Sequence, residues 1–170
     1  MSDQPARFAW GHINLNVRDL DRAVAFYELL GFTTFIPAIP YLGLAVGAEA
    51  APVSDGSTKG LGLPQGTRGR ACIMQLGDGF PKLDLTEFAD LEQRPPLTNG
   101  DRGLVRLCLV SQDLKADHAR LAAEGVEFLS PPQVCQDGMA ELATCVDPDG
   151  ALIELLQVHL DKWPKLPAGT

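Results

Sequence analysis

Positive charge is scarce in this sequence, and it is never concentrated. Among 170 residues, 14 lysines and arginines stand against 22 aspartates and glutamates, which gives a formal net charge of −8. No cluster of Lys or Arg is long enough to form a basic stripe. We therefore expect neither nucleic acid nor an anionic membrane surface as a partner.

Long hydrophobic runs are also missing. No apolar run reaches the roughly 20 residues that a membrane helix needs, and the polar start, MSDQPAR, is not a secretory signal. A cytoplasmic protein is therefore expected. The 45% of hydrophobic and 21% of charged residues are typical of soluble globular proteins.

Cysteine is limited to four residues with no Cys-x-x-Cys spacing. Neither a zinc site nor a disulfide framework is predicted from such a pattern. Cys72, Cys108 and Cys145 stand within apolar strand patterns, and we expect them in the core.

The sequence does contain one unit written twice. GHINLNVRDLDRAVAFYELLGF, residues 11–32, recurs in degraded form as VRLCLVSQDLKADHARLAAEGV, residues 105–126. From His12 the next Asp, Leu and Gly of the pattern follow at offsets of 7, 8 and 19, and the same offsets follow Arg106. Each copy predicts a strand, an Asp N-cap, a short amphipathic helix (residues 20–30 and 114–124) and a Gly that ends it.

Both halves continue in the same order. Each has an Asp-Gly turn signal and then a strand in which an acid lies between apolar residues, at Asp84 and at Glu154. The order βαβββ is therefore predicted for residues 7–90 and again for residues 102–158, with residues 159–170 as an irregular tail. Two identically ordered halves predict a pseudo-twofold α+β fold.

The halves differ in length because of residues 47–69, which are rich in Gly, Pro, Ser and Ala. His12 to Asp84 spans 72 residues, whereas Arg106 to Glu154 spans 48. No regular element is expected in this insertion. It is either a surface excursion or a lid over a pocket.

The repeated motif, together with the ending VDPDGALIELLQV, resembles the vicinal oxygen chelate superfamily. That superfamily includes glyoxalase I, extradiol dioxygenases and the bleomycin-resistance proteins. The resemblance covers residues 8–158 and implies one domain of residues 7–158, in which the paired modules form a curved, partly open, barrel-like sheet of eight strands. It also implies a small-molecule ligand or substrate and a homodimer.

The resemblance further implies a metal site. In metal-binding members, the first and last strands of each half supply one ligand each, and the matching positions here are His12, Asp84, Arg106 and Glu154. His12, Asp84 and Glu154 are expected to hold Fe, Mn, Ni, Zn or Mg with open positions for a substrate, with Glu154 also in a catalytic role. Asp84 is one methylene shorter than the usual Glu.

Arg106 departs from the pattern because a guanidinium has no lone pair for a metal. It is expected either to bind substrate, together with Asn14 and Gln75, or to pair with Asp84 or Glu154 and fill the site without a metal. Two functions therefore stay open. One is a metal-dependent lyase, isomerase or dioxygenase acting on a small oxygenated molecule; the other is a metal-free small-molecule binder of the bleomycin-resistance type. A salt-bridge network left over from a lost site is the third interpretation.

Overall fold

The computed structural model describes residues 8–47 and 49–164. The chain divides into two compact units, residues 1–94 and 95–170. The first residue of the predicted domain, residue 48 of the predicted loop and residues 165–170 of the predicted tail lie outside the described residues. Within the described ranges, no helix combines the length and apolarity needed to cross a bilayer.

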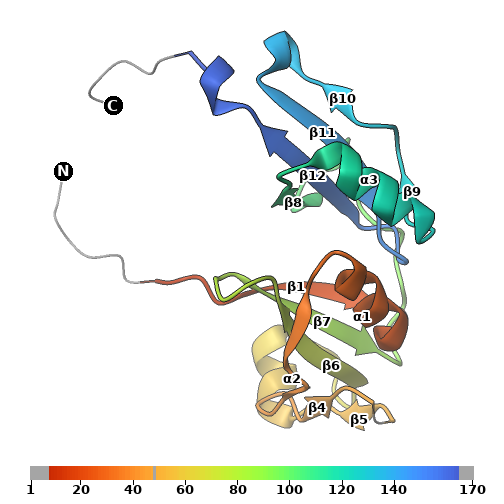
Figure 1. The fold of residues 1–170 in the computed structure, drawn as a ribbon. Helices are drawn as coiled ribbons and strands as arrows, with labels where there is room; N and C mark the ends of the chain where they lie inside the picture. Colours follow the sequence, from red (N-terminus) through yellow and green to blue (C-terminus); the bar gives the residue numbers. More distant parts are fainter. Residues whose placement is uncertain (1–7, 48, 165–170) are drawn as a thin grey trace, which may run out of the picture. The chain divides into compact units, whose positions relative to one another are not determined.

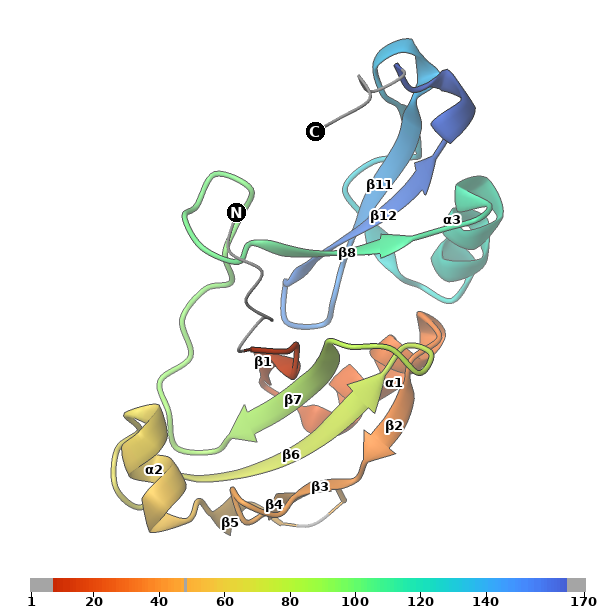
Figure 2. The same cartoon turned by 90° about the vertical axis from the view of Figure 1, so that its left-hand side faces the viewer.

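The first unit is built on a five-stranded sheet with the order β1-β7-β6-β2, in which β5 also pairs with β6 (Figure 2). Strands β1 and β7 run parallel, and the other pairs are antiparallel. Strands β3 and β4 form a separate two-stranded sheet. The elements of this unit are β1 (His12–Val17), α1 (Leu20–Leu29), β2 (Thr33–Ile36), β3 (Ala38–Ile39), β4 (Leu44–Ala45), β5 (Ala51–Pro52), α2 (Asp55–Leu61), β6 (Arg68–Gln75) and β7 (Lys82–Phe88) (Figure 1).

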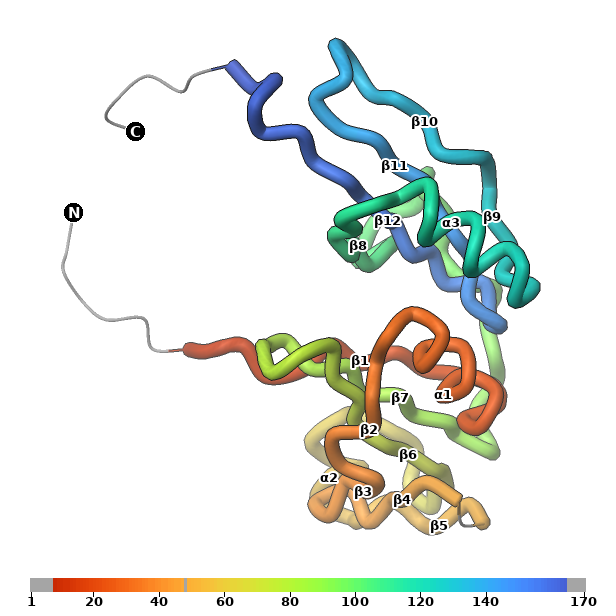
Figure 3. The backbone as a smooth tube through the Cα atoms, viewed as in Figure 1, coloured from red at the N-terminus to blue at the C-terminus, as the bar shows by residue number. Residues whose placement is uncertain are grey.

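The second unit repeats this plan with the strand order β10-β11-β12-β8, in which β9 also pairs with β11. Its first and last strands, β8 and β12, are again parallel neighbours. The described part of the predicted irregular tail contains a 3-10 turn, Leu160–Lys162, and the Trp163 indole donates to the Met139 carbonyl at 3.0 Å. The elements are β8 (Arg106–Val110), α3 (Leu114–Ala123), β9 (Glu127–Phe128), β10 (Gln133–Val134), β11 (Ala140–Val146) and β12 (Leu152–Val158) (Figure 3).

In each five-stranded sheet, two short strands pair with the same edge of one longer strand, so the sheet is only four strands wide. In the first unit β2 and β5 both pair with β6, at opposite ends of that strand. In the second unit β9 and β10 share β11 in the same way. The α+β class and the two βαβββ modules are therefore confirmed, as two open sheets that do not close into a barrel.

The helix ends follow the predicted repeat. Asp19 caps α1 by accepting from the Arg22 N–H at 3.0 Å, and Asp113 caps α3 through Ala116 with the same distance. Gly31 and Gly125 follow the two helices with φ of +93° and +86°, a region that glycine enters without steric cost.

At the start of each helix, a second side chain accepts a hydrogen bond from a backbone N–H, a contact that was not predicted from the sequence. The Leu20 N–H of α1 donates to Glu87 of β7 at 2.7 Å, and the Leu114 N–H of α3 donates to Gln157 of β12 at 2.8 Å. In both units the last strand therefore fixes the helix that follows the first strand.

One face of each sheet is covered by its helix. In the first unit α1 packs against β7, with Leu20, Ala23 and Tyr27 fully buried. Cys72 and Cys145 are buried, as predicted, but the prediction for Cys108 was wrong because its side chain is exposed. Cys108 lies on β8, an edge strand, on the face that carries Arg106 and Val110.

The prediction that residues 47–69 contain no regular element was also wrong. They hold β5, α2 and the first residues of β6. Ser54 caps α2, and Gly62 ends it. Gly56 and Gly60 each weaken an isolated helix by about 1 kcal/mol, so local propensity does not predict α2, and contacts with the rest of the unit must hold it.

Candidate functional site

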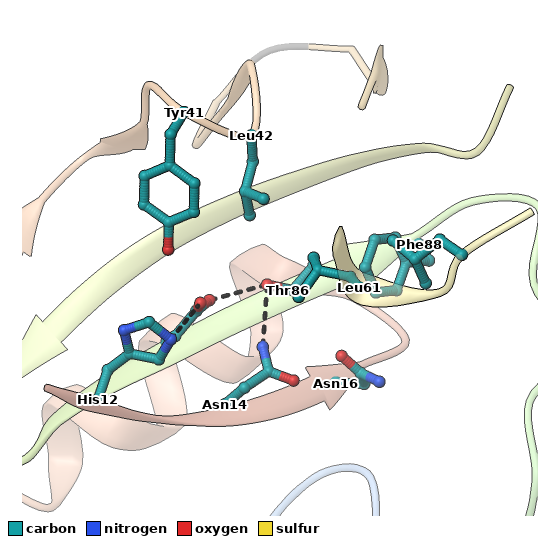
Figure 4. A pocket seen from close by; sticks show the side chains of 10 residues that line it. His12, Asn14, Asn16, Tyr41, Leu42, Leu61, Thr86 and Phe88 are labelled. Atoms are coloured by element: carbon teal, nitrogen blue, oxygen red, sulfur yellow. Dashed lines mark hydrogen bonds and ion pairs between the residues drawn. The ribbon is translucent and has the colours of Figure 1, made fainter. Parts of the chain in front are cut away.

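A cavity of about 260 Å³ lies within the first unit. Strands β1 and β7 form its floor, and Tyr41 and Leu42 approach from the other side (Figure 4). Leu61 and Leu63 complete the lining. The polar residues that line it are His12, Asn14, Asn16, Asp84 and Thr86. The lining residues with large apolar or aromatic groups are Tyr41, Leu42, Leu61, Leu63 and Phe88.

The floor follows from the two-residue period of a strand and the register of β1 on β7. His12, Asn14 and Asn16 alternate with apolar residues and therefore share the face that borders the cavity. The parallel register sets Asn14 opposite Asp84, and Asn16 opposite Thr86. Two neighbouring strands thus contribute one continuous polar surface.

Hydrogen bonds link this floor. Thr86 Oγ1 donates to Asp84 Oδ1 at 2.8 Å, and Asn14 Nδ2 donates to Thr86 Oγ1 at 3.3 Å. His12 Nε2 lies 3.6 Å from Asp84 Oδ2. Figure 4 shows these contacts from His12 across to Asn14, with the Tyr41 hydroxyl pointing from the loop toward them.

Asp84 is the charged group at the centre of the floor and is only 3% exposed. Loss of hydration raises the pKa of its carboxyl, while the bonds from Thr86 and Asn14 and the proximity of His12 act in the opposite direction. Burial also raises the pKa of Tyr41, and the charge of Asp84 adds to that rise. The Asp84 carboxylate and the Tyr41 hydroxyl therefore interact electrostatically across the cavity.

The second unit places a different cluster at the matching positions. Arg106 Nε donates to Glu154 Oε2 at 2.6 Å, and its Nη1 donates to Asn99 Oδ1 at 2.9 Å. The Cys108 thiol lies 3.7 Å from the other carboxylate oxygen, Glu154 Oε1. Both oxygens of Glu154 are thus in contact with donors.

Two pairs among the sequence-predicted residues are in contact, His12 with Asp84 and Arg106 with Glu154. The convergence of all four in one cavity stays a prediction. Asn14 lines the floor, and its role in substrate binding stays a prediction. Gln75 accepts from Lys82 Nζ at 2.8 Å and does not belong to the residues that line the cavity.

Sequence reasoning missed several lining residues. Thr86 stands two residues after Asp84 on β7, so the strand period that predicted the β1 face would also have found it. Leu61 and Leu63 carried no signal, because their segment was expected to be irregular. Asn99, the second partner of Arg106, lies in a loop with no motif.

For the predicted metal, the structure describes the donor atoms within each unit. Among residues 8–47 and 49–164, no three His, Cys, Asp or Glu side chains are placed to hold one ion. His12 and Asp84 supply two donors. Glu154, the third predicted ligand, is bound by the guanidinium of Arg106. His12 and Asp84 belong to one unit and Glu154 to the other, so the three-ligand site stays a prediction.

Residues 9–155 match the family model of the Glyoxalase/Bleomycin resistance protein/Dioxygenase superfamily. The chain belongs to this superfamily. The match spans most of the sequence and includes both βαβββ modules.

Solved structures of superfamily members agree with this assignment. A glyoxalase family protein from Bacillus cereus is 19% identical with a TM-score of 0.70, covering 93% of this chain and 98% of that one. A glyoxylase/bleomycin resistance protein/dioxygenase domain from Frankia sp. EAN1pec is 18% identical with a TM-score of 0.59, at 93% and 100% coverage. The trypanothione-dependent glyoxalase I of Leishmania major is 21% identical with a TM-score of 0.55, at 89% and 87% coverage.

These identities establish a shared fold and do not transfer an activity. No curated protein matches this superfamily member significantly in sequence. Its function therefore has to be argued from the geometry of its own residues.

Proposed function

We propose that this superfamily member binds a small organic molecule in the cavity of its first unit and needs no divalent metal to do so. The proposal is the metal-free alternative that Arg106 raised in the sequence. The protein has a glyoxalase-like fold and would then bind a small molecule without converting it.

The contact between Arg106 and Glu154 is the observation that carries this proposal. An arginine side chain keeps its charge at any physiological pH and offers no lone pair to a metal. At 2.6 Å its Nε makes a short, charge-assisted bond to Glu154. A cation that used Glu154 as a ligand would have to displace that guanidinium and tolerate its charge nearby.

The cavity suits a small molecule. Its volume of about 260 Å³ is a little below the roughly 300–1,000 Å³ of drug-sized pockets. Its floor offers both hydrogen-bond donors and acceptors, whereas its remaining walls are apolar. This combination of an apolar enclosure with few polar groups is typical of ligand sites.

The test is ligand binding after removal of metals. Protein treated with a chelator is screened by thermal shift against diols, hydroxy acids, phenols and thiol conjugates, and each hit is titrated by calorimetry. We expect hits whose affinity is unchanged by the chelator and falls about tenfold or more in Asn14→Ala, since that change removes a polar contact. Gln133→Ala, on an exposed strand outside the cavity, serves as the matched control. Ligands that bind only after a divalent ion is added would contradict the proposal.

A metal-dependent lyase, isomerase or dioxygenase is the second candidate. The observation in its favour is that His12 Nε2 and Asp84 Oδ2 lie 3.6 Å apart in the floor of the cavity, on adjacent parallel strands. With Glu154 these two form the ligand set implied by the superfamily, and a bound ion would supply Lewis-acid chemistry. Loss of an intrinsic metal in His12→Ala would favour this candidate.

Assembly and location complete the proposal. A homodimer is expected because superfamily resemblance implies one, and a cytoplasmic location is expected from the sequence. Light scattering at the 18.2 kDa of a single chain would contradict the dimer.

A further inference from the structure

The cavity is divided by chemistry into a polar floor and an apolar roof. The floor comes from β1 and β7, with Phe88 as its one apolar member, and the roof consists of Tyr41, Leu42, Leu61 and Leu63. Tyr41 and Leu61 each keep 59% of their surface exposed, although they border a cavity. Apolar groups that remain in water beside a concave site gain free energy when a ligand covers them.

Helix α2 is what brings Leu61 to this position. The Ser54 N–H donates to the Leu42 carbonyl at 3.0 Å. The hydroxyls of Ser54 and Ser57 both donate to the Tyr41 carbonyl, at 2.9 Å and 2.6 Å. These three bonds tie α2 to residues 41–42, so the two parts of the roof are held together.

The roof is also anchored in the interior of the unit. Leu42 belongs to a buried cluster with Ile39, Leu44 and Val53, and Leu63 packs against that cluster. Leu61, at the last turn of α2, is the most exposed of the three leucines at the roof. A substitution of Leu61 should therefore change the cavity with little effect on folding.

The charges around the cavity limit the ligand further. Among the described residues that line it, Asp84 is the one carboxylate, and neither lysine nor arginine is present. A ligand carboxylate or phosphate would meet Asp84 with no lysine or arginine beside it, and the His12 imidazole already lies against that carboxylate. An uncharged hydroxyl can instead donate to Asp84 or accept from Asn14.

We propose that α2 selects the ligand. Its Leu61, together with Tyr41, covers the apolar body of an uncharged amphiphilic molecule, such as a substituted phenol, whose hydroxyl bonds to the floor. This inference rests on the proposed function and specifies its ligand class. The matching segment of the second unit, between β10 and β11, is shorter and holds only a 3-10 turn, Gln136–Gly138, in place of α2.

The experiment is a calorimetric series of phenol, 4-ethylphenol and 4-butylphenol with the full chain in chelator. Each methylene that the roof removes from water should tighten binding by up to about fourfold. In Leu61→Ala, 4-butylphenol should bind about tenfold more weakly while phenol changes less than twofold. Leu160→Ala, which truncates another exposed leucine outside the cavity, should leave the whole series unchanged. Circular dichroism and thermal unfolding verify that each variant is folded.

Equal changes for phenol and 4-butylphenol in Leu61→Ala, or no change for either, would overturn the role of α2. So would a series that binds neither in chelator nor with added metal. Binding of 4-butylbenzoate as tightly as 4-butylphenol would overturn the uncharged ligand class. A selective effect of Leu61→Ala that requires added metal would support α2 as the selector and contradict the metal-free function, so the two proposals fail separately.

Discussion

Arg106 donates through Nε to Glu154 Oε2 at 2.6 Å, at the two positions where the superfamily pattern implies a pair of metal ligands. In the first unit the same two positions hold His12 and Asp84, whose nearest polar atoms are 3.6 Å apart. The duplication has therefore kept the backbone plan in both halves and has given each half a different side-chain chemistry. An ion pair occupies one half and a polar cavity floor the other.

Alkylation of Cys108 reports on this ion pair. Burial and the neighbouring Glu154 raise the pKa of the thiol, and Arg106 lowers it. Since the thiolate is the reacting form, Glu154→Gln should lower the pKa and speed the reaction with iodoacetamide severalfold, whereas Arg106→Ala should slow it. Peptide mass spectrometry of the Cys108 peptide measures both rates. Glu127→Gln, which removes an exposed charge elsewhere in the unit, should have no effect; identical rates in all variants would contradict the geometry.

Asp84 should make stability depend on pH in an unusual direction. Its folded pKa is raised above the ordinary 3.8 because it is buried. Between these two pKa values the native state binds more protons than the unfolded state, so the free energy of unfolding falls as pH rises through that window. Asp84→Asn should therefore be more stable than the wild type at neutral pH, by about 1 kcal/mol. The difference should disappear below the ordinary carboxyl pKa.

Denaturation by urea across this pH range measures the effect, and Asp101 provides a control of opposite sign. The Thr98 backbone N–H and hydroxyl lower the pKa of Asp101. Its contribution is present at neutral pH and is lost as pH falls, so Asp101→Asn should weaken the protein at neutral pH only. An Asp84→Asn variant that is less stable than the wild type at neutral pH would mean that the carboxylate is stabilised in the folded state, contrary to this account.

The bonds from the last strands to the helix starts give a paired prediction. Glu87→Ala and Gln157→Ala each leave one helix N–H without its acceptor and should cost about 1 kcal/mol of stability. Glu87→Ala should cost more, because Glu87 also accepts from Arg70 at 2.7 Å. Glu87→Gln keeps an acceptor for Leu20 and should recover part of the loss. Chemical denaturation measures all three, and alanine variants as stable as the wild type would show that these bonds contribute nothing.

Much of the backbone plan was predictable because it depends on short-range signals. The caps at Asp19 and Asp113 and the glycines after the helices determine the helix ends locally. The alternation in β1 predicted which face would be polar, and that face does border the cavity. Here the local pattern and the final packing agree.

The roof of the cavity was not predictable, because its causes are non-local. Helix α2 contains two glycines and is held by serine hydroxyls that bond to a carbonyl 13 and 16 residues earlier in the chain. No local sequence pattern predicts a hydrogen bond between residues so far apart in the chain. The exposure of Cys108 was missed for a related reason: a strand pattern does not reveal which faces lack a covering element.

Titration of the purified, chelator-treated protein with cobalt(II), followed by absorbance and calorimetry, tests the central claim most directly. If the protein works without a divalent metal, the wild type should bind no stoichiometric cobalt, because Arg106 is bonded to Glu154. The Arg106→His variant should bind cobalt, because it places an imidazole beside Glu154 and Cys108 in place of the guanidinium. Uptake of one cobalt per wild-type chain that is abolished by His12→Ala would contradict the claim.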